Sequence, residues 1–111
     1  MAVTRYHNIT GSTGVTVELI EPGSKINNIK SIMLTNVHAS SDATVTLFIQ
    51  DNPVSTAAKT FNIIHTIAIP ADSSLLLDNE SVISFDNGSS TSFGLYITVG
   101  SSDTVDVLLG L

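Results

Sequence analysis

The sequence predicts an all-β protein: a single antiparallel β-sandwich, jelly-roll-like, with eight or nine short strands. Apolar residues recur at every second position in short runs, and Ser, Asp, Asn and Gly residues separate these runs. No segment shows the 3.6-residue apolar spacing of an amphipathic helix, so we expect little helix. At 111 residues the chain has the length of one domain. Strands spaced about 8–12 residues apart in such a chain are typical of two-sheet sandwiches.

An immunoglobulin-like sandwich is the alternative topology. Immunoglobulin domains typically carry a core Trp and a pair of Cys residues, and this chain contains neither. The jelly roll is therefore the favoured arrangement.

The first half of the chain contains three expected strands behind an N-terminal segment. Residues 1–12 form either an arm or a first strand, and residues 13–111 form the sandwich domain. The strand that begins at Val15 ends at the turn signal Pro22-Gly23. Residues 29–37 carry apolar side chains on both faces, so we expect a central strand that is covered on both sides. A strand over residues 43–49 stops before Pro53, because proline supplies no backbone donor.

The longest alternating run of the chain lies between residues 61 and 69. Its shared face consists of Phe61, Ile63, His65, Ile67 and Ile69. We expect this strand to form the centre of the core and Pro70 to end it. Two short strands follow over residues 75–77 and 82–85, and two longer ones over residues 93–99 and 105–111.

Charge and cysteine content exclude several classes of function. Ten acidic residues against four basic ones give a net charge of −6, which opposes binding to a nucleic-acid backbone. The absence of Cys from the sequence excludes disulfides and thiolate sites and suits assembly in a reducing cytoplasm. Residues 1–12 lack the apolar segment of a signal peptide, and no apolar run approaches the roughly 20 residues that span a bilayer. We therefore expect no nucleic-acid partner and no membrane anchor.

Low charge also bears on association. Charged residues make up 13% of the chain, about half of the usual share. Such a surface protects exposed sheet edges poorly, because charged side chains are a common device against edge-to-edge pairing. We expect the edges to be paired or covered in a homo-oligomer or a docked subunit.

The histidines do not form a recognisable site. His7, His38 and His65 lack the short spacings that are typical of metal ligands. His65 lies on an apolar strand face, where a hydrogen-bonded core or interface histidine is favoured over a catalytic one. No Gly-x-Ser-x-Gly motif supports a serine nucleophile. We expect no catalytic residue, no metal, no cofactor and no enzymatic activity.

Three Asp-Asn pairs fall in predicted loops: Asp51-Asn52, Asp78-Asn79 and Asp86-Asn87. Their oxygen atoms are hard ligands that suit calcium. None of them matches the EF-hand loop, and Asp and Asn residues favour turns by bonding nearby amides. We expect turns at these positions.

Aromatic residues bear on glycan binding, which many sandwiches perform with exposed rings. Phe48, Phe61, Phe85 and Phe93 fall within alternating runs, which indicates core positions. Tyr6 and Tyr96 remain as candidate exposed rings.

The middle and last thirds of the chain resemble small virion structural proteins of tailed bacteriophages. In that family a strand ending in Thr-Asn precedes a hairpin, an Ile-Pro-Ala step leads into a hydrophobic strand, and a Ser-Asp-Thr-Val-Asp-Val-like strand closes the sheet. The matching segments, which fall within residues 29–111, are Lys30-Ser31-Ile32-Met33-Leu34-Thr35-Asn36, Ala43-Thr44-Val45-Thr46-Leu47-Phe48-Ile49, Ile69-Pro70-Ala71-Asp72-Ser73-Ser74-Leu75-Leu76-Leu77 and the stretch from Ser101 to Leu108.

The resemblance implies a β-sandwich subunit of a virion that is assembled in the host cytoplasm. The favoured role is a capsid decoration (cement) protein that oligomerises, as a trimer, and clamps neighbouring major capsid subunits. A neck, tail or fibre-base protein is the alternative within the same class. A host-surface glycan-binding module is the alternative from a different class, with Tyr6 or Tyr96 in contact with the sugar.

Overall fold

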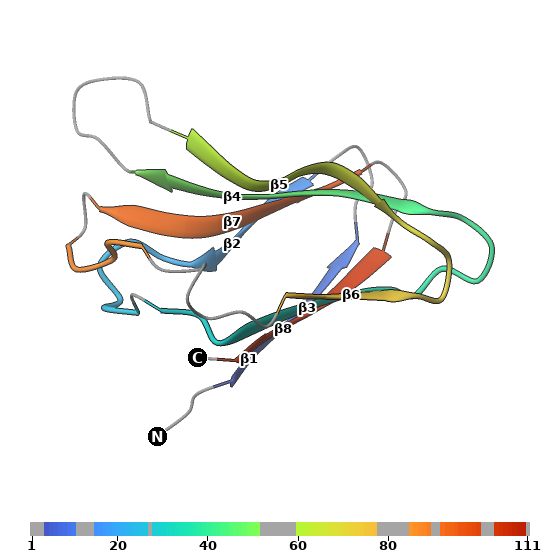
Figure 1. Ribbon diagram of the computed structural model, residues 1–111, viewed down its shortest axis with the longest axis horizontal. Coiled ribbons are helices and arrows are strands. Elements are labelled where there is room, and N and C mark those ends of the chain that lie inside the picture. The colour runs from blue at the N-terminus through green and yellow to red at the C-terminus, as the bar shows by residue number, and fades with distance from the viewer. Residues whose placement is uncertain are drawn as a thin grey trace.

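The computed structural model has eight strands in two antiparallel sheets, which confirms the predicted all-β sandwich. It describes residues 4–10, 15–26, 28–51, 60–77, 85–89, 92–100 and 104–110, and it contains no helix in these ranges. The strands are β1 (Thr4–Thr10), β2 (Val15–Ile20), β3 (Ser31–Asn36), β4 (Ala43–Asp51), β5 (Thr60–Ile69), β6 (Ser74–Leu77), β7 (Phe93–Val99) and β8 (Thr104–Gly110). One sheet has the order β1-β8-β3-β6 and the other β2-β7-β4-β5 (Figure 1).

The strand pairing is that of an eight-stranded jelly roll. β1 pairs with β8, β2 with β7, β3 with β6 and β4 with β5, as in a long hairpin that has been rolled up. The additional pairs β3–β8 and β4–β7 complete the two sheets. Thr4–Thr10, where the sequence permitted an arm or a strand, is the edge strand β1, and Thr4 lies opposite Gly110 of β8.

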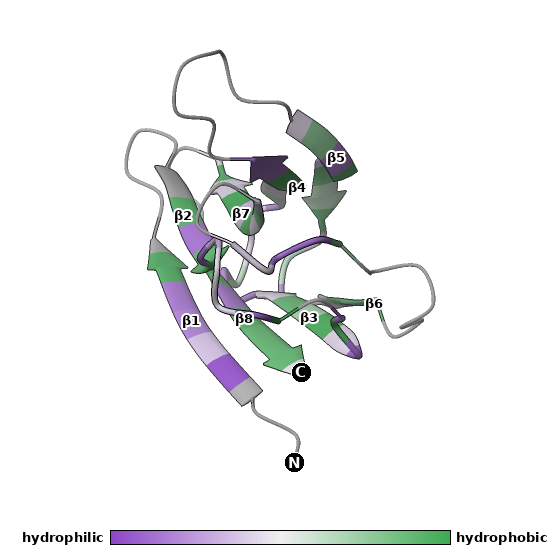
Figure 2. Cartoon of the chain, turned by 90° about the vertical axis from the view of Figure 1, so that its left-hand side faces the viewer, coloured by the Kyte–Doolittle hydropathy of each residue, from purple (hydrophilic) through white to green (hydrophobic). Residues whose placement is uncertain are grey.

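The core lies between the two sheets. Alternation in β3, β4, β7 and β8 places every second side chain inside, where the transfer of apolar surface out of water stabilises the fold. The largest fully buried side chains are Leu19, Ile20, Ile29, Ile32, Leu34, Leu47, Leu95, Ile97, Leu109, Val45, Val99 and Val105. The edge strand β1 is mostly hydrophilic (purple in Figure 2) and contributes Ile9 to this core.

The prediction that residues 61–69 form the centre of the core is wrong. These residues form β5, an edge strand of its sheet, and their side chains are exposed except for the half-buried Ile64 and the buried Ile69. Phe61, assigned to the core from sequence, is 56% exposed, and His65 is exposed as well. The centre of the core is formed instead by β7 and β4 in one sheet and by β8 and β3 in the other.

Two register shifts explain why the alternation of β5 misleads. Val45 lies opposite Ile67 and Leu47 opposite Ile64, so β5 holds one extra residue between the two pairs. A second shift separates Leu47 from Phe48, whose partner is Asn62. Each extra residue is a β-bulge, which moves the following side chains to the other face. Side chains at every second position of β5 therefore do not share one continuous face of the sheet.

Other expectations are corrected in part. β3 lies inside its sheet, as expected, but its outer face is not covered: Met33 is half-buried and Val37, just beyond the strand, is exposed. Phe85 is buried but lies outside any strand, and the remainder of the strand expected over residues 82–85 lies outside the described residues. Leu111 also lies outside them.

We expect the removal of one methyl group to lower the free energy of unfolding more in the core than on the edge strand β5. Ile97→Val should lower the free energy of unfolding by about 1 kcal/mol, because it leaves a small void among packed side chains. Ile67→Val should change it by less than about 0.5 kcal/mol, because Ile67 already faces solvent. Urea unfolding of both variants measures the difference. A larger loss of unfolding free energy for Ile67→Val than for Ile97→Val would contradict the assignment of β5 to the edge of the sheet.

Candidate interaction surfaces

An apolar row crosses the outer face of the β1-β8-β3-β6 sheet, with one side chain from each strand. Tyr6 lies opposite Leu108, Leu108 opposite Met33, and Met33 opposite Leu76. Tyr6 is 72% exposed and Leu76 53% exposed, while Leu108 and Met33 are half-buried between them. We call these four residues the apolar row. Exposed apolar side chains that adjoin one another, unlike scattered ones, mark interaction sites on soluble proteins.

A polar row lies beside the apolar row on the same face, two residues along each strand. It consists of Asn8, Asp106, Thr35 and Ser74, which face one another across the four strands. The amide nitrogen Nδ2 of Asn8 donates to Oδ1 of Asp106, and the hydroxyl groups of Thr35 and Ser74 are 2.8 Å apart in a hydrogen bond. The contrast between the rows shows that polar residues are the ordinary outward choice on this sheet, so the apolar row is the exception that needs an explanation.

The apolar row has the dimensions of a contact strip and not of a complete interface. Neighbouring strands lie about 4.8 Å apart, so four strands span roughly 14 Å. A standard stable interface buries about 800 Å² on each partner. The row alone therefore suits a partner that also contacts other parts of the molecule, or that binds many copies at once.

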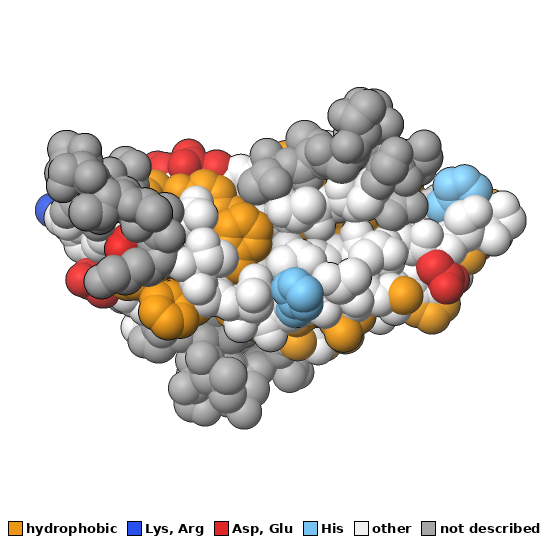
Figure 3. All heavy atoms as spheres, turned by 90° about the horizontal axis from the view of Figure 1, so that it is seen from above, with side chains coloured by type: hydrophobic (Ala, Val, Ile, Leu, Met, Phe, Trp, Pro, Cys, Tyr) orange, Lys and Arg blue, Asp and Glu red, His pale blue; other side chains and the backbone are white. Residues whose placement is uncertain are grey.

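The outer face of the β2-β7-β4-β5 sheet has a different chemistry. Seen from above, it is covered mainly by uncharged polar side chains and backbone (white in Figure 3). Its aromatic pair is Phe48 and Tyr96, which stack with ring centroids 5.6 Å apart. Burial raises the pKa of the Tyr96 phenol above its ordinary value, and the neighbouring Glu18 carboxylate contributes by its charge and a hydrogen bond. Of the two rings that the sequence predicted to be exposed, Tyr6 is exposed, whereas Tyr96 is half-buried in this packing.

The second candidate surface is the β5 edge, which we define by Phe61, Ile63 and Ile67. The exposed fractions of Ile63 and Ile67 are 36% and 42%. The ring of Phe61 rests partly on Phe93 of β7, with centroids 5.8 Å apart. No charged residue occurs anywhere between Thr60 and Ile69. An edge strand without charges is open to association, because charge is one of the features that block pairing.

A buried asparagine holds one end of the sandwich, where the chain crosses between the sheets from β3 to β4 and from β5 to β6 (Figure 1). Nδ2 of Asn36 donates to the carbonyl oxygens of Ser41, at 2.8 Å, and Ile69, at 2.9 Å. Its Oδ1 accepts from the backbone N–H of His38 at 2.9 Å. Asn36 is fully buried. The β3–β4 crossover and the end of β5 are therefore tied together by one side chain.

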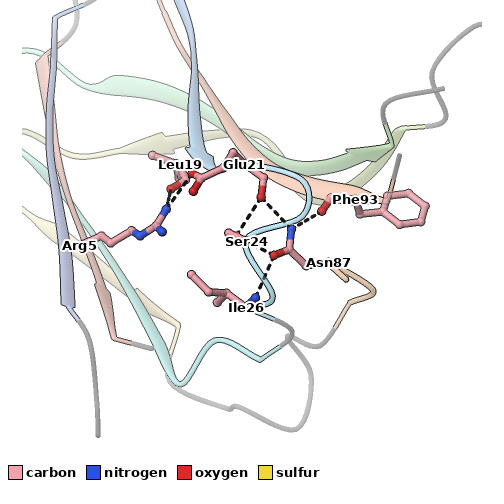
Figure 4. A network of polar contacts seen from close by, with 7 residues as sticks. All are labelled: Arg5, Leu19, Glu21, Ser24, Ile26, Asn87 and Phe93. Carbon is pink, nitrogen blue, oxygen red and sulfur yellow. Dashed lines mark hydrogen bonds and ion pairs between the residues drawn. The ribbon is translucent and has the colours of Figure 1, made fainter. Parts of the chain in front are cut away.

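A second buried asparagine, Asn87, holds the opposite end, where the chain crosses from β2 to β3 and from β6 to β7 (Figure 4). Its Oδ1 accepts from the N–H of Ile26 at 2.9 Å and the hydroxyl of Ser24 at 2.7 Å. Its Nδ2 donates to the carbonyl oxygens of Glu21, at 3.0 Å, and Phe93, at 2.6 Å. The turn that it holds is the predicted Pro-Gly turn, with Gly23 at a φ of 86°.

Arg5 connects the two sheets at their β1 and β2 edges. Its Nη1 donates to the carbonyl oxygen of Leu19 and to Oε2 of Glu21, both at 3.1 Å. The hydrogen bond from Arg5 lowers the pKa of the Glu21 carboxyl below its ordinary value, and the charge of Arg5 acts in the same direction. This side of the sandwich is closed by a polar contact.

The structure places the predicted candidate residues far from one another in the fold. His7 lies on β1, His38 in the β3–β4 crossover and His65 on β5, and no group of three His, Asp or Glu residues suited to a metal occurs among the described residues. Nδ1 of His38 accepts from the N–H groups of Ser40 and Ser41, each at 3.1 Å, so it supports a turn.

The three Asp-Asn pairs, all predicted to form turns, differ in the structure. Asn87 is the buried asparagine described above, and Oδ1 of Asp86 accepts from the N–H of Gly88 at 3.2 Å, so this pair does form a turn. Asp51 ends β4. Asn52 and the pair Asp78-Asn79 lie outside the described residues. No described helix is long and apolar enough to cross a membrane.

Comparisons with known proteins give structural similarities only. No family model and no curated protein matches the chain. Among solved structures, it is similar to a chain in the structure of infectious bursal disease virus, Gx strain, with a TM-score of 0.47 and 15% sequence identity. The similarity covers 98% of this chain and 32% of that chain, so the protein spans about a third of the other's length. Over the described residues, the geometry defines a jelly-roll sandwich with two exposed apolar surfaces.

The sequence contains a partial signal for these surfaces. It predicts Tyr6 as an exposed ring, but it does not indicate Leu76, Leu108 and Met33 as its neighbours. Leu108 interrupts the outward series that Thr104 and Asp106 begin, which is the signal that could have identified it. The alignment of the row depends on the strand order, which alternation along one strand does not contain.

We expect the loss of the Asn87 side chain to destabilise the fold strongly. Asn87→Ala would remove the side-chain partner of the Ile26 N–H and of the Phe93 carbonyl oxygen, so the free energy of unfolding should fall by at least about 2 kcal/mol. Asn62→Ala, at an exposed position of β5, is the control and should change it by less than about 0.5 kcal/mol. Urea unfolding measures both values. Similar values for the two variants would show that the network contributes little.

We also expect His7 to make stability depend on pH. Among the described residues no group bonds its buried Nε2, and burial lowers its pKa below the ordinary 6.5, with a further contribution from the charge of Arg5. Above pH 6.5 both the folded and the unfolded chain hold His7 neutral. As the pH falls through 6.5, the unfolded chain takes up a proton that the folded chain resists, so stability decreases.

The measurement is the thermal midpoint at pH 7.5 and at pH 5.5. His7→Leu should show a smaller decrease between these two pH values than the wild type. His65→Leu, at an exposed position, is the matched control. An equal change of pH dependence in both variants would contradict this role for His7.

Proposed function

We propose that this protein is a structural subunit of a tailed-phage virion, and specifically a capsid decoration protein. It assembles with the particle in the host cytoplasm and binds neighbouring major capsid subunits through the apolar row. Its mechanism is the burial of apolar surface, and no catalytic step is involved. It acts as a homo-oligomer, for which the resemblance to phage virion proteins implies a trimer.

The observation that carries this proposal is the apolar row. Four apolar side chains stand in register across every strand of one sheet, beside a row that is entirely polar. None of the four is charged, so a partner can cover them without desolvating an ion. Full burial of one such side chain contributes up to about 1.5–3 kcal/mol, and these four already have part of their surface covered.

A repeating partner fits the small size of the row. A capsid lattice presents the same contact many times, and an oligomer that engages several contacts at once gains affinity through its effective concentration. A ligand that binds only the folded, assembled lattice also stabilises it by mass action. Multivalent binding and stabilisation by mass action together support a clamping role for a subunit whose individual contact is small.

The test uses particles that lack the protein and purified wild-type protein added back. We expect the wild type to co-sediment with the particles and to raise the temperature at which they release DNA. Leu76→Lys should reduce binding at least about tenfold, because burial of the row would then require burial of a charge. Thr44→Lys, at an exposed position on the other sheet, should bind within about twofold of the wild type.

Copy number on purified particles separates the two locations within the virion. A decoration protein should be present in numbers comparable to those of the major capsid protein, as measured by quantitative electrophoresis. Copies sufficient for a single ring would assign the protein to the neck or tail instead. Equal heat resistance of particles with and without the protein would contradict clamping.

A further inference from the structure

We propose that the β5 edge is the surface through which two copies of this chain join. The inference deepens the proposed function, because it assigns self-association to one strand and leaves the apolar row free for a different partner. The observations are the exposed side chains of Phe61, Ile63 and Ile67 and the absence of charge along the whole strand.

The four edge strands of the two sheets differ in how they are protected. β1 contains Arg5 and β2 contains Glu18, and the ion pair of Arg5 with Glu21 closes that side of the sandwich. β6 has no charged residue but is only four residues long, and short edge strands resist pairing. β5 has ten residues and no charge. It is thus the longest of these edges, and neither charge nor shortness protects it.

Charge favours a second copy as the occupant of this edge. Each chain carries a net charge of −6, so two copies repel one another over most orientations. In a contact through β5, at least one side of the interface carries no charged residue, whichever surface of the other copy it meets. The uncharged strand is therefore a surface on which identical acidic chains can meet without direct repulsion between opposed groups.

The bulges determine the kind of contact. The two register shifts bend β5, and Thr66 has a φ of 55°, with its N–H bonded to the hydroxyl of Thr46 at 3.0 Å. Bulges of this kind limit the pairing of a new strand along the backbone. The contact should therefore consist mainly of side-chain packing by Phe61, Ile63 and Ile67, with backbone pairing confined to the regular ends of the strand.

The length of the edge suits an interface of ordinary size. Ten residues of extended chain span about 34 Å. A circular patch of about 800 Å², the share of each partner in a standard interface, is about 32 Å across. About a twofold axis β5 would meet β5 of the other copy, and about a threefold axis it would meet a different surface of the neighbour. The measured mass identifies which symmetry applies.

The experiment is sedimentation equilibrium of the purified chain over a wide range of concentrations. We expect the wild type to form an oligomer of two or three copies. Ile63→Lys should weaken association at least about tenfold, because the charge would be placed in the contact. Leu76→Lys, which replaces an exposed apolar residue of the apolar row with the same charge, should change the association constant by less than about twofold.

The outcomes separate this inference from the proposed function. A wild-type chain that remains monomeric at the highest concentration overturns the inference, and so does an oligomer that Ile63→Lys leaves intact. In either case, binding of particles through the apolar row would still support the proposed function. Circular dichroism and urea unfolding verify that each variant is folded, and Phe61→Lys provides the same test if Ile63→Lys does not fold.

Discussion

The fold depends on how the chain is held where it changes sheets, and two buried asparagines provide this. Asn36 and Asn87 lie at opposite ends of the sandwich, and each bonds the backbone of two crossovers that are distant in the sequence. Packing between the sheets stabilises any arrangement that buries enough apolar surface, whereas a buried amide is satisfied in one geometry only. The core thus supplies the driving force, and the two amides select the arrangement of the crossovers.

The sequence predicted the parts of the fold that depend on local pattern. The all-β class, the inward residues of β3, β4, β7 and β8, and the Pro-Gly turn all follow from period-two alternation and turn chemistry. The prediction for β5 was wrong, because the bulges and the edge position of that strand depend on how it pairs in the sheet. The sequence alone shows neither feature. The roles of Asn36 and Asn87 were missed for a related reason. Asn36 falls in a predicted strand and Asn87 in a predicted turn, but the burial of each side chain depends on a segment far along the chain.

The two apolar surfaces have complementary roles in the proposed assembly. The apolar row belongs to one sheet and the β5 edge to the other, so association of copies and docking on a larger partner use different strands. The remaining outward surface of the β2-β7-β4-β5 sheet is largely uncharged and polar (Figure 3). A subunit of this kind can join two types of partner without moving its backbone, as expected of a fold that is held at both ends by buried hydrogen bonds.

The position of β8 has a consequence for synthesis. This strand lies between β1 and β3, so the β1-β8-β3-β6 sheet stays divided until β8 has been synthesised. Pairing of Tyr6 with Leu108 closes a loop of about a hundred residues, which makes it a slow, late event in folding. A chain without β8 therefore cannot form the complete apolar row, because Leu108 is one of its four residues.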